Sequence, residues 1–169
     1  AFLVKKHAGK DDDRWLYLPA LDLVKRIEGK QGRTAFAGSD FLYEDISGRP
    51  VSADKHRVEK TTDKHYVLLS TPRRRGSVEF DAYRVFIDKT TFLPLKAVFY
   101  RKGKKIRQIQ MAKVETISGH PTVTKAIARD FVKNSRTTIT MSRVKFDLDL
   151  PGNLFTEASL RNAPSVAKR

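Results

Sequence analysis

Apolar and polar residues alternate along most of this chain, in short runs that are separated by turn residues. This two-residue period places successive side chains on opposite faces of a strand, and it is typical of antiparallel sheets with one buried face. We therefore expect about eight strands among these runs, and two short helices. The runs cover residues 2–6, 15–18, 23–27, 57–61, 66–70, 78–87, 95–101, 106–117, 122–132 and 137–148.

Turn-rich segments connect these runs in a way that favours successive hairpins. Residues 8–13, 88–91 and 133–136 are polar stretches of this kind, each between two apolar runs. Within the run 106–117 the apolar spacing slips once between Ile106 and Ile109, which predicts a bulge. A meander of this length usually curls or closes into a barrel. The sequence thus predicts a mainly β protein built on an antiparallel curved sheet.

Two segments depart from the strand pattern and are expected to be short helices. One is residues 39–46, where Ser39 or Asp40 can cap a single helical turn, and the other is residues 153–161. Residues 162–169 are expected to form a flexible tail. No repeat or low-complexity linker divides the rest, so we expect one domain over residues 1–161.

The balance of charge indicates an anionic partner. The 169 residues include 34 Lys and Arg against 19 Asp and Glu, a net charge of +15. Such a charge attracts anionic lipid head groups or nucleic acid, although it can also serve solubility alone. The chain has no cysteine, which excludes disulfides and thiolate sites. No apolar run approaches the roughly 18 residues that a membrane-spanning helix needs.

Residue patterns for catalysis are missing. Residues 29–34 contain glycine and basic residues without the spacing of a phosphate-binding loop, and Gly38-Ser39-Asp40 lacks the second glycine of a nucleophile elbow. We expect no enzymatic activity, no metal and no cofactor. The histidines fall in or beside predicted turns without metalloprotease spacing and are interpreted as solvated loop residues: His7, His56, His65 and His120.

Basic clusters on predicted turns are candidates for docking on an anionic membrane or an acidic partner. Nucleic acid is the alternative ligand, but no nucleic-acid-binding motif accompanies the clusters, and the aromatic residues sit within apolar runs. A basic nucleic-acid-binding β domain and a structural envelope protein without ligand remain the two alternative functions. The docking candidates are Arg73, Arg74, Arg75, Lys104, Lys105 and Arg107.

Four segments together carry a family resemblance. Residues 15–27 begin Trp-Leu-Tyr-Leu-Pro-Ala-Leu, residues 36–45 read Phe-Ala-Gly-Ser-Asp-Phe-Leu-Tyr-Glu-Asp, residues 86–96 contain Asp-Lys-Thr-Thr-Phe-Leu-Pro, and residues 148–156 contain Leu-Pro-Gly-Asn-Leu-Phe. In this order and spacing they resemble the outer membrane lipoprotein-sorting protein family, the LolA-like carriers. The resemblance covers residues 1 to about 161.

The resemblance implies a periplasmic, non-enzymatic carrier with an unclosed antiparallel half-barrel, similar to LolA and LppX. Short helices would cover its concave face, and its hydrophobic cavity would shelter lipid acyl chains or lipoproteins on the way to the outer membrane. Family members usually carry a signal peptide, a helix and several strands before the position of Ala1, so we expect this chain to lack them. An exposed edge near residues 2–6 would then permit a dimer. An inner-membrane exporter of the resistance-nodulation-division type is the implied partner.

Candidate ligand-binding residues follow from the resemblance and from side-chain size. Each cavity candidate can equally belong to an ordinary core, and Asp40 can equally be a helix cap. The candidates for anchoring a lid helix are Arg26, Asp40, Glu44 and Asp45. The cavity candidates are Leu16, Leu18, Phe41, Leu42, Phe99, Met111, Ile127 and Ile139.

Overall fold

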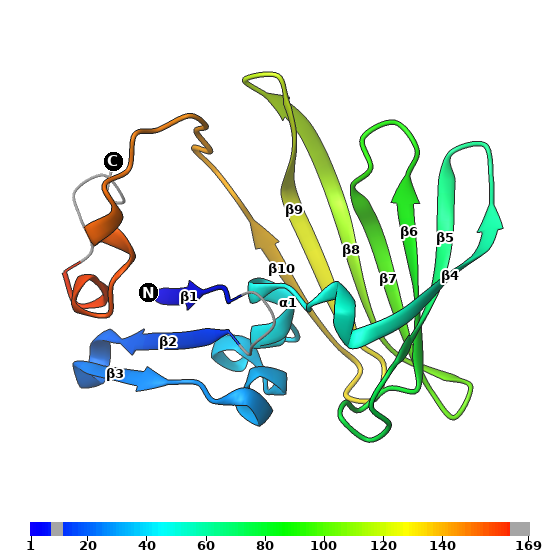
Figure 1. Ribbon diagram of the computed structural model, residues 1–169, viewed down its shortest axis with the longest axis horizontal. Coiled ribbons are helices and arrows are strands. Elements are labelled where there is room, and N and C mark those ends of the chain that lie inside the picture. Colours follow the sequence, from blue (N-terminus) through cyan, green and yellow to red (C-terminus); the bar gives the residue numbers. More distant parts are fainter. Residues whose placement is uncertain (8–11, 163–169) are drawn as a thin grey trace. The chain divides into compact units, whose positions relative to one another are not determined.

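The computed structural model describes residues 1–7 and 12–162, and its contacts divide the chain into two compact units (Figure 1). Unit 1 comprises Ala1–Thr34, Leu42–Ser47 and the chain from Asp147 onward, and unit 2 comprises Ala35–Phe41 and Gly48–Phe146. Most of the predicted loop 8–13 and of the predicted tail 162–169 lies outside the described residues. The single domain over residues 1–161 stays a prediction, because compact units need not fold independently.

Unit 1 is built on a three-stranded antiparallel sheet. Its order is β1 (Phe2–Lys5), β2 (Asp13–Leu18) and β3 (Leu23–Arg26). Pro19 opens the turn between β2 and β3, and Asp22 closes it in a left-handed conformation, with φ of 44°. The helical elements of unit 1 are α1 (Tyr43–Ser47) and the 3₁₀ turns Pro19–Leu21, Gly29–Arg33, Gly152–Phe155 and Ala158–Leu160.

Unit 2 contains a seven-stranded antiparallel meander, as the alternating pattern predicts. Each strand pairs with its neighbours in the chain, and among the described residues no ladder joins β4 to β10, so the sheet is not closed (Figure 1). The mainly β, unclosed antiparallel fold is therefore confirmed. The strands are β4 (Asp54–Thr61), β5 (His65–Pro72), β6 (Ala82–Asp88), β7 (Pro94–Arg101), β8 (Lys104–Ile117), β9 (His120–Asp130) and β10 (Ser135–Thr140).

The predicted bulge is present in β8. Phe99 of β7 lies opposite Arg107, whereas Tyr100 lies opposite Lys105, so Ile106 is the extra residue. Further register shifts follow on the β9 side of the same strand, between Met111 and Val114. These irregularities all lie in β8, which is the longest strand of this sheet. Bulges of this kind increase the local twist of a strand.

Two predicted strands are too long. β6 begins at Ala82 rather than at residue 78, because Phe80 leaves the sheet direction and enters the core. β10 ends at Thr140 rather than at residue 148. Arg143 and Asp147 both adopt a φ of 55°, which is incompatible with an extended strand. The alternation of apolar and polar residues in this segment therefore does not reflect a strand.

The predicted helix at residues 39–46 is wrong in its start and its cap. The helix α1 begins at Tyr43, and the carboxylate of Asp45 accepts a hydrogen bond from the Leu42 amide at 2.7 Å. The hydroxyl of Ser39 donates to the Phe36 carbonyl instead, in a 3₁₀ turn over Phe36–Gly38. The predicted helix at residues 153–161 consists of two separate 3₁₀ turns.

Candidate functional site

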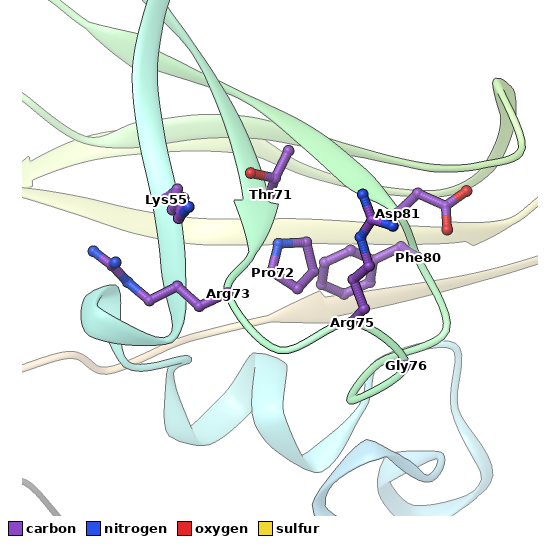
Figure 2. Close-up of a pocket in the computed structure, with 8 residues that line it drawn as sticks. All are labelled: Lys55, Thr71, Pro72, Arg73, Arg75, Gly76, Phe80 and Asp81. Atoms are coloured by element: carbon purple, nitrogen blue, oxygen red, sulfur yellow. The ribbon is translucent and has the colours of Figure 1, made fainter.

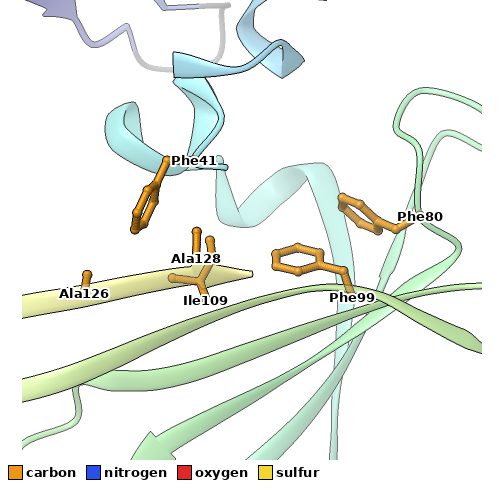
Figure 3. Close-up of a cluster of buried hydrophobic side chains, with 6 residues drawn as sticks. All are labelled: Phe41, Phe80, Phe99, Ile109, Ala126 and Ala128. Atoms are coloured by element: carbon orange, nitrogen blue, oxygen red, sulfur yellow. The ribbon is translucent and has the colours of Figure 1, made fainter. Parts of the chain in front are cut away.

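An apolar cluster covers one face of the seven-stranded sheet (Figure 3). Strand pairing places Ile109 opposite both Ala97 and Ala128, and it places Met111 and Ile139 on either side of Ala126. Small side chains on β9 leave room for larger ones from other elements to pack over them. The buried members of the cluster are Phe41, Phe80, Phe99, Ile109, Ala126 and Ala128.

A short segment, Ala35–Phe41, lies over this face, and we call it the strap. Phe41 points from the strap toward Ala128 and Ile109 and is 3% exposed (Figure 3). The Phe36 amide donates to the Phe41 carbonyl at 2.7 Å, which closes the strap into a loop. Within it Ala37 and Gly38 both have positive φ values, of 48° and 76°.

Asp40 fixes the strap to the edge strand β10. Its carboxylate accepts hydrogen bonds from the hydroxyls of Ser135 and Thr137, the latter at 2.7 Å, and its amide donates to the Thr137 hydroxyl at 3.0 Å. Thr137 lies opposite Ala128, so the strap is held on the face that carries the cluster. Asp40 thus connects the cover of the apolar face to the sheet's edge.

The apolar face continues beyond its buried members. Met111, Val123 and Ile139 pack against the cluster but are only half-buried. A pocket of about 400 Å³ lies beside β8, β9 and β10, and its lining is mixed. The apolar side chains of Ile117, Met141 and Val144 line it together with charged ones, those of Lys113, Glu115, Lys125 and Arg143. Partly exposed apolar side chains beside a short covering segment are suited to receiving a flexible apolar ligand.

A buried polar network lies at the other end of the sheet. Asp54 is 1% exposed, and its carboxylate accepts from Arg49 Nε and Nη2 at 2.7 and 2.8 Å and from the Tyr83 hydroxyl at 2.7 Å. Nearby, His56 Nδ1 lies 2.7 Å from the hydroxyl of the fully buried Ser70. The network ties the start of β4 to β5 and β6.

This network shifts the pKa of both of its acidic groups. Burial raises the pKa of the Asp54 carboxyl, but hydrogen bonds from Arg49 and Tyr83 outweigh burial, and the pKa ends below its ordinary value. The pKa of Tyr83 is raised, first by burial and then by its hydrogen bond to Asp54. Both groups are therefore held in one protonation state near neutral pH, which suits a structural role.

A basic pocket opens beside this network, and Figure 2 shows the residues that line it. Its volume is about 560 Å³, and it lies where β4 and β5 meet the connection to β6. Phe80, a member of the apolar cluster, forms part of its wall. The lining residues are Lys55, Thr71, Pro72, Arg73, Arg75, Gly76, Phe80 and Asp81.

The structure brings together half of the cavity residues that were predicted from sequence. Phe41, Phe99, Met111 and Ile139 belong to the apolar cluster or pack against it. Ile127 lies on the opposite face, because it alternates with the two buried alanines of β9. The remaining three belong to unit 1, which is described by itself: Leu16, Leu18 and Leu42.

The predicted lid anchors lie in three different elements, β3, the strap and α1. Arg26 pairs with Asp13 at 2.5 Å and lies over the Trp15 ring. Asp40 holds the strap to β10, whereas Glu44 and Asp45 lie in the first turn of α1. An anchoring role for Asp40 remains a proposal, and its partners are Ser135 and Thr137 rather than Arg26.

Five of the six predicted docking residues are exposed on the surface of unit 2. Arg107 differs, because it is half-buried with its guanidinium 4.3 Å from the centre of the Phe99 ring. It therefore belongs to the apolar face, where it covers an aromatic ring. The exposed five are Arg73, Arg74, Arg75, Lys104 and Lys105.

The histidines do not gather into a site. Residues 1–7 and 12–162 contain no group of three or more His, Asp or Glu side chains that could hold a metal ion. His56 lies within β4, and His65 and His120 are the first residues of β5 and β9, which corrects the expectation of loop positions for these three residues. No helix in the described part of the chain is long and apolar enough to cross a membrane.

Two features of the site were missed by sequence reasoning. The Asp54 network joins Arg49 to Tyr83 through residues that are up to 34 positions apart in the chain, and none of them forms a motif. The pairing of the strap with β10 spans 97 residues. No local motif marks Asp54, because the fold brings Tyr83 to it from a different strand.

The unclosed sheet with a covered apolar face has the fold of the LolA-like lipoprotein-sorting proteins, which confirms the resemblance seen in the sequence. A family model described as "Uncharacterized protein" matches residues 1–162, and the chain belongs to that family. No curated protein matches the chain.

Three solved structures are similar to the chain. A DUF1329 family protein from Desulfovibrio piger is 29% identical, with a TM-score of 0.82 over 94% of this chain and 70% of its own. A candidate outer membrane lipoprotein-sorting protein domain from Vibrio parahaemolyticus is 28% identical, with a TM-score of 0.81 over 95% and 70%. A LolA superfamily protein from Nitrosomonas europaea, 22% identical over 88% and 68% with a TM-score of 0.61, shares the fold.

Proposed function

We propose that this protein is a non-enzymatic carrier of the cell envelope that binds lipid acyl chains or a lipoprotein's acyl chains on the apolar face of its seven-stranded sheet. The observation that carries the proposal is the strap, because the hydrogen bonds of Asp40 hold this cover of an apolar face against the edge strand. The lipoprotein-sorting name of a similar structure supports the cargo class.

Displacing the strap would expose the buried part of the cluster to a ligand. Phe41 would leave Ala126 and Ala128, and the ligand's methylene groups would take its place. Each methylene group removed from water gains roughly 0.8 kcal/mol, so about ten of them give on the order of 8 kcal/mol, or micromolar affinity. That affinity allows both uptake and release.

Several features of the carrier role remain part of the proposal. The proposal places the protein in the periplasm, where it would receive cargo from an exporter of the resistance-nodulation-division type. Strap displacement would be the lid movement, with Asp40 as the anchor. The exposed basic turns around Arg74 and Lys104 would dock the carrier on anionic lipid, at up to about 1 kcal/mol for each charge near the surface.

Native mass spectrometry of the purified protein, before and after organic extraction, tests the proposal. We expect an adduct of defined lipid mass that extraction removes. The substitution Ile139→Glu puts a charge on the half-buried apolar face and should abolish the adduct, because burying an unpaired carboxylate is costly.

The matched control is Thr138→Glu on the same strand, since Thr138 is exposed and points to the opposite face. Circular dichroism checks that both variants fold. The proposal fails if the wild-type protein carries no lipid and binds no fluorescent fatty acid, or if both glutamate variants retain lipid equally.

A further inference from the structure

The basic pocket carries an unusual excess of positive charge for a concave site. Lys55, Arg73 and Arg75 line it together with a single carboxylate, that of Asp81. The Asp81 carboxylate already accepts a hydrogen bond from the Lys102 amide at 2.5 Å. The pocket therefore presents more cationic donors than the protein's own acceptors use.

The donor groups of these cations are directed by the fold. Arg73 Nε donates to the Asp54 carbonyl at 3.1 Å, which fixes the guanidinium and leaves its two terminal amino groups for another acceptor. The Arg73 amide donates to the Ala53 carbonyl at 3.0 Å, which ties the loop after β5 to the residue before β4. Within residues 1–7 and 12–162, Lys55 and Arg75 have no ion pair or hydrogen bond from their side chains.

The wall of the pocket leads to the apolar face. Phe80 is 8% exposed, and in Figure 2 its ring lies between Pro72 and the side chain of Arg75. The same ring lies 5.1 Å from the ring of Phe99, in the cluster that the strap covers. A ligand with a charged group in the pocket could therefore place an attached chain along the aromatic side chains.

We propose that this pocket binds the phosphate group of an anionic amphiphile, a deduction that rests on the proposed carrier function and names its cargo as a phosphate-bearing lipid. Phosphate matches the observed donors, because guanidinium groups bind its oxygens in pairs and an ammonium group adds a point charge. A neutral head group would offer the three cations no negative charge. The Asp81 carboxylate in the lining would limit how much negative charge the site accepts.

Isothermal titration calorimetry with three probes tests the proposal: dodecyl phosphate, dodecyl maltoside and inorganic phosphate, each amphiphile below its micelle concentration. The wild-type protein should bind dodecyl phosphate about 100-fold more tightly than the neutral dodecyl maltoside. In the double variant Arg73→Gln and Arg75→Gln this preference should fall to within a few-fold, about tenfold for each guanidinium lost. Binding of dodecyl maltoside should not change.

The matched control is Arg129→Gln with Arg136→Gln, which removes two exposed guanidinium groups from β9 and β10 and should keep the preference. Equal affinity of the wild-type protein for both amphiphiles would overturn the phosphate site and leave the carrier function intact. Retained preference in the arginine variant would also overturn it.

Two further outcomes separate the possible sources of phosphate. If inorganic phosphate binds as tightly as dodecyl phosphate and neither amphiphile shows a contribution from its chain, the pocket is a site for free phosphate and the carrier function fails. If a single-stranded oligonucleotide binds through Arg73 and Arg75 while dodecyl phosphate does not, the lipid proposal is overturned in favour of nucleic acid.

Discussion

Replacing Asp54 by alanine should lower the free energy of unfolding strongly. We expect one of the largest losses among truncations of polar side chains in unit 2. The carboxylate is fully buried and accepts three hydrogen bonds, two from Arg49 and one from Tyr83. Its removal takes away the acceptor of two hydrogen bonds from the Arg49 guanidinium, which is only 17% exposed. Breaking a buried pair in this way costs about 3–5 kcal/mol.

Urea unfolding followed by circular dichroism measures this loss. With a slope of about 2 kcal/mol per molar urea, the midpoint should fall by about 2 M. The matched control is Glu59→Ala. The Glu59 carboxylate also accepts two hydrogen bonds from one arginine, from Nε and Nη2 of Arg84 at 2.5 and 2.9 Å. That pair is exposed to solvent, so we expect a loss below about 1 kcal/mol.

The same network predicts how stability depends on pH. The pKa of Asp54 in the folded protein lies below its ordinary value of 3.8, so its stabilising contribution is complete above that value. It is lost as the pH falls through the lower, folded pKa. The wild-type midpoint should therefore drop more steeply below about pH 4 than that of Asp54→Ala. Equal midpoint losses for the Asp54 and Glu59 variants at pH 7 would refute the argument that burial makes the difference.

Two further predictions concern the apolar face. Asp40→Ala should release the strap from Ser135 and Thr137, lowering the free energy of unfolding by about 1–3 kcal/mol and increasing the fluorescence of an apolar dye; unchanged dye binding would show that the strap stays in place. Phe99→Ala should leave a cavity beside Phe80 and cost about 3–5 kcal/mol, so calorimetry should show a melting temperature lower by roughly 10 °C, and a drop under about 3 °C would contradict the packing described.

The sheet was predictable from the sequence because its signals are local. Alternation and turn residues identified the hairpins of the meander, and a single slip of the apolar spacing identified the bulge at Ile106. The end of β10 was not predictable in this way. Val144 and Phe146 keep the alternating pattern beyond the strand, while the left-handed conformation of Arg143 redirects the chain.

The contacts that define the candidate site are non-local, which explains why sequence reasoning missed them. Local sequence patterns predict Asp40 to be a helix cap, because Thr137 is 97 residues away and only the fold brings it close. Side-chain size assigned Ile127 and Ile139 to the cavity together, and alternation alone cannot say which face of a sheet is covered. The basic run Arg73–Arg75 was recognised, whereas its proximity to Lys55 depends on the register between β4 and β5.

The missing ladder between β4 and β10 has a mechanical consequence. In a closed barrel, strand number and stagger fix the radius, and any change of radius requires hydrogen bonds to break. Here each of the six adjacent strand pairings can be kept while the sheet bends or flattens, because the two edges are not joined. The curvature of the apolar face is thus set by side-chain contacts rather than by the backbone. Under the proposed carrier function, elastic bending of one sheet would admit cargoes of different girth without any loss of its hydrogen bonding.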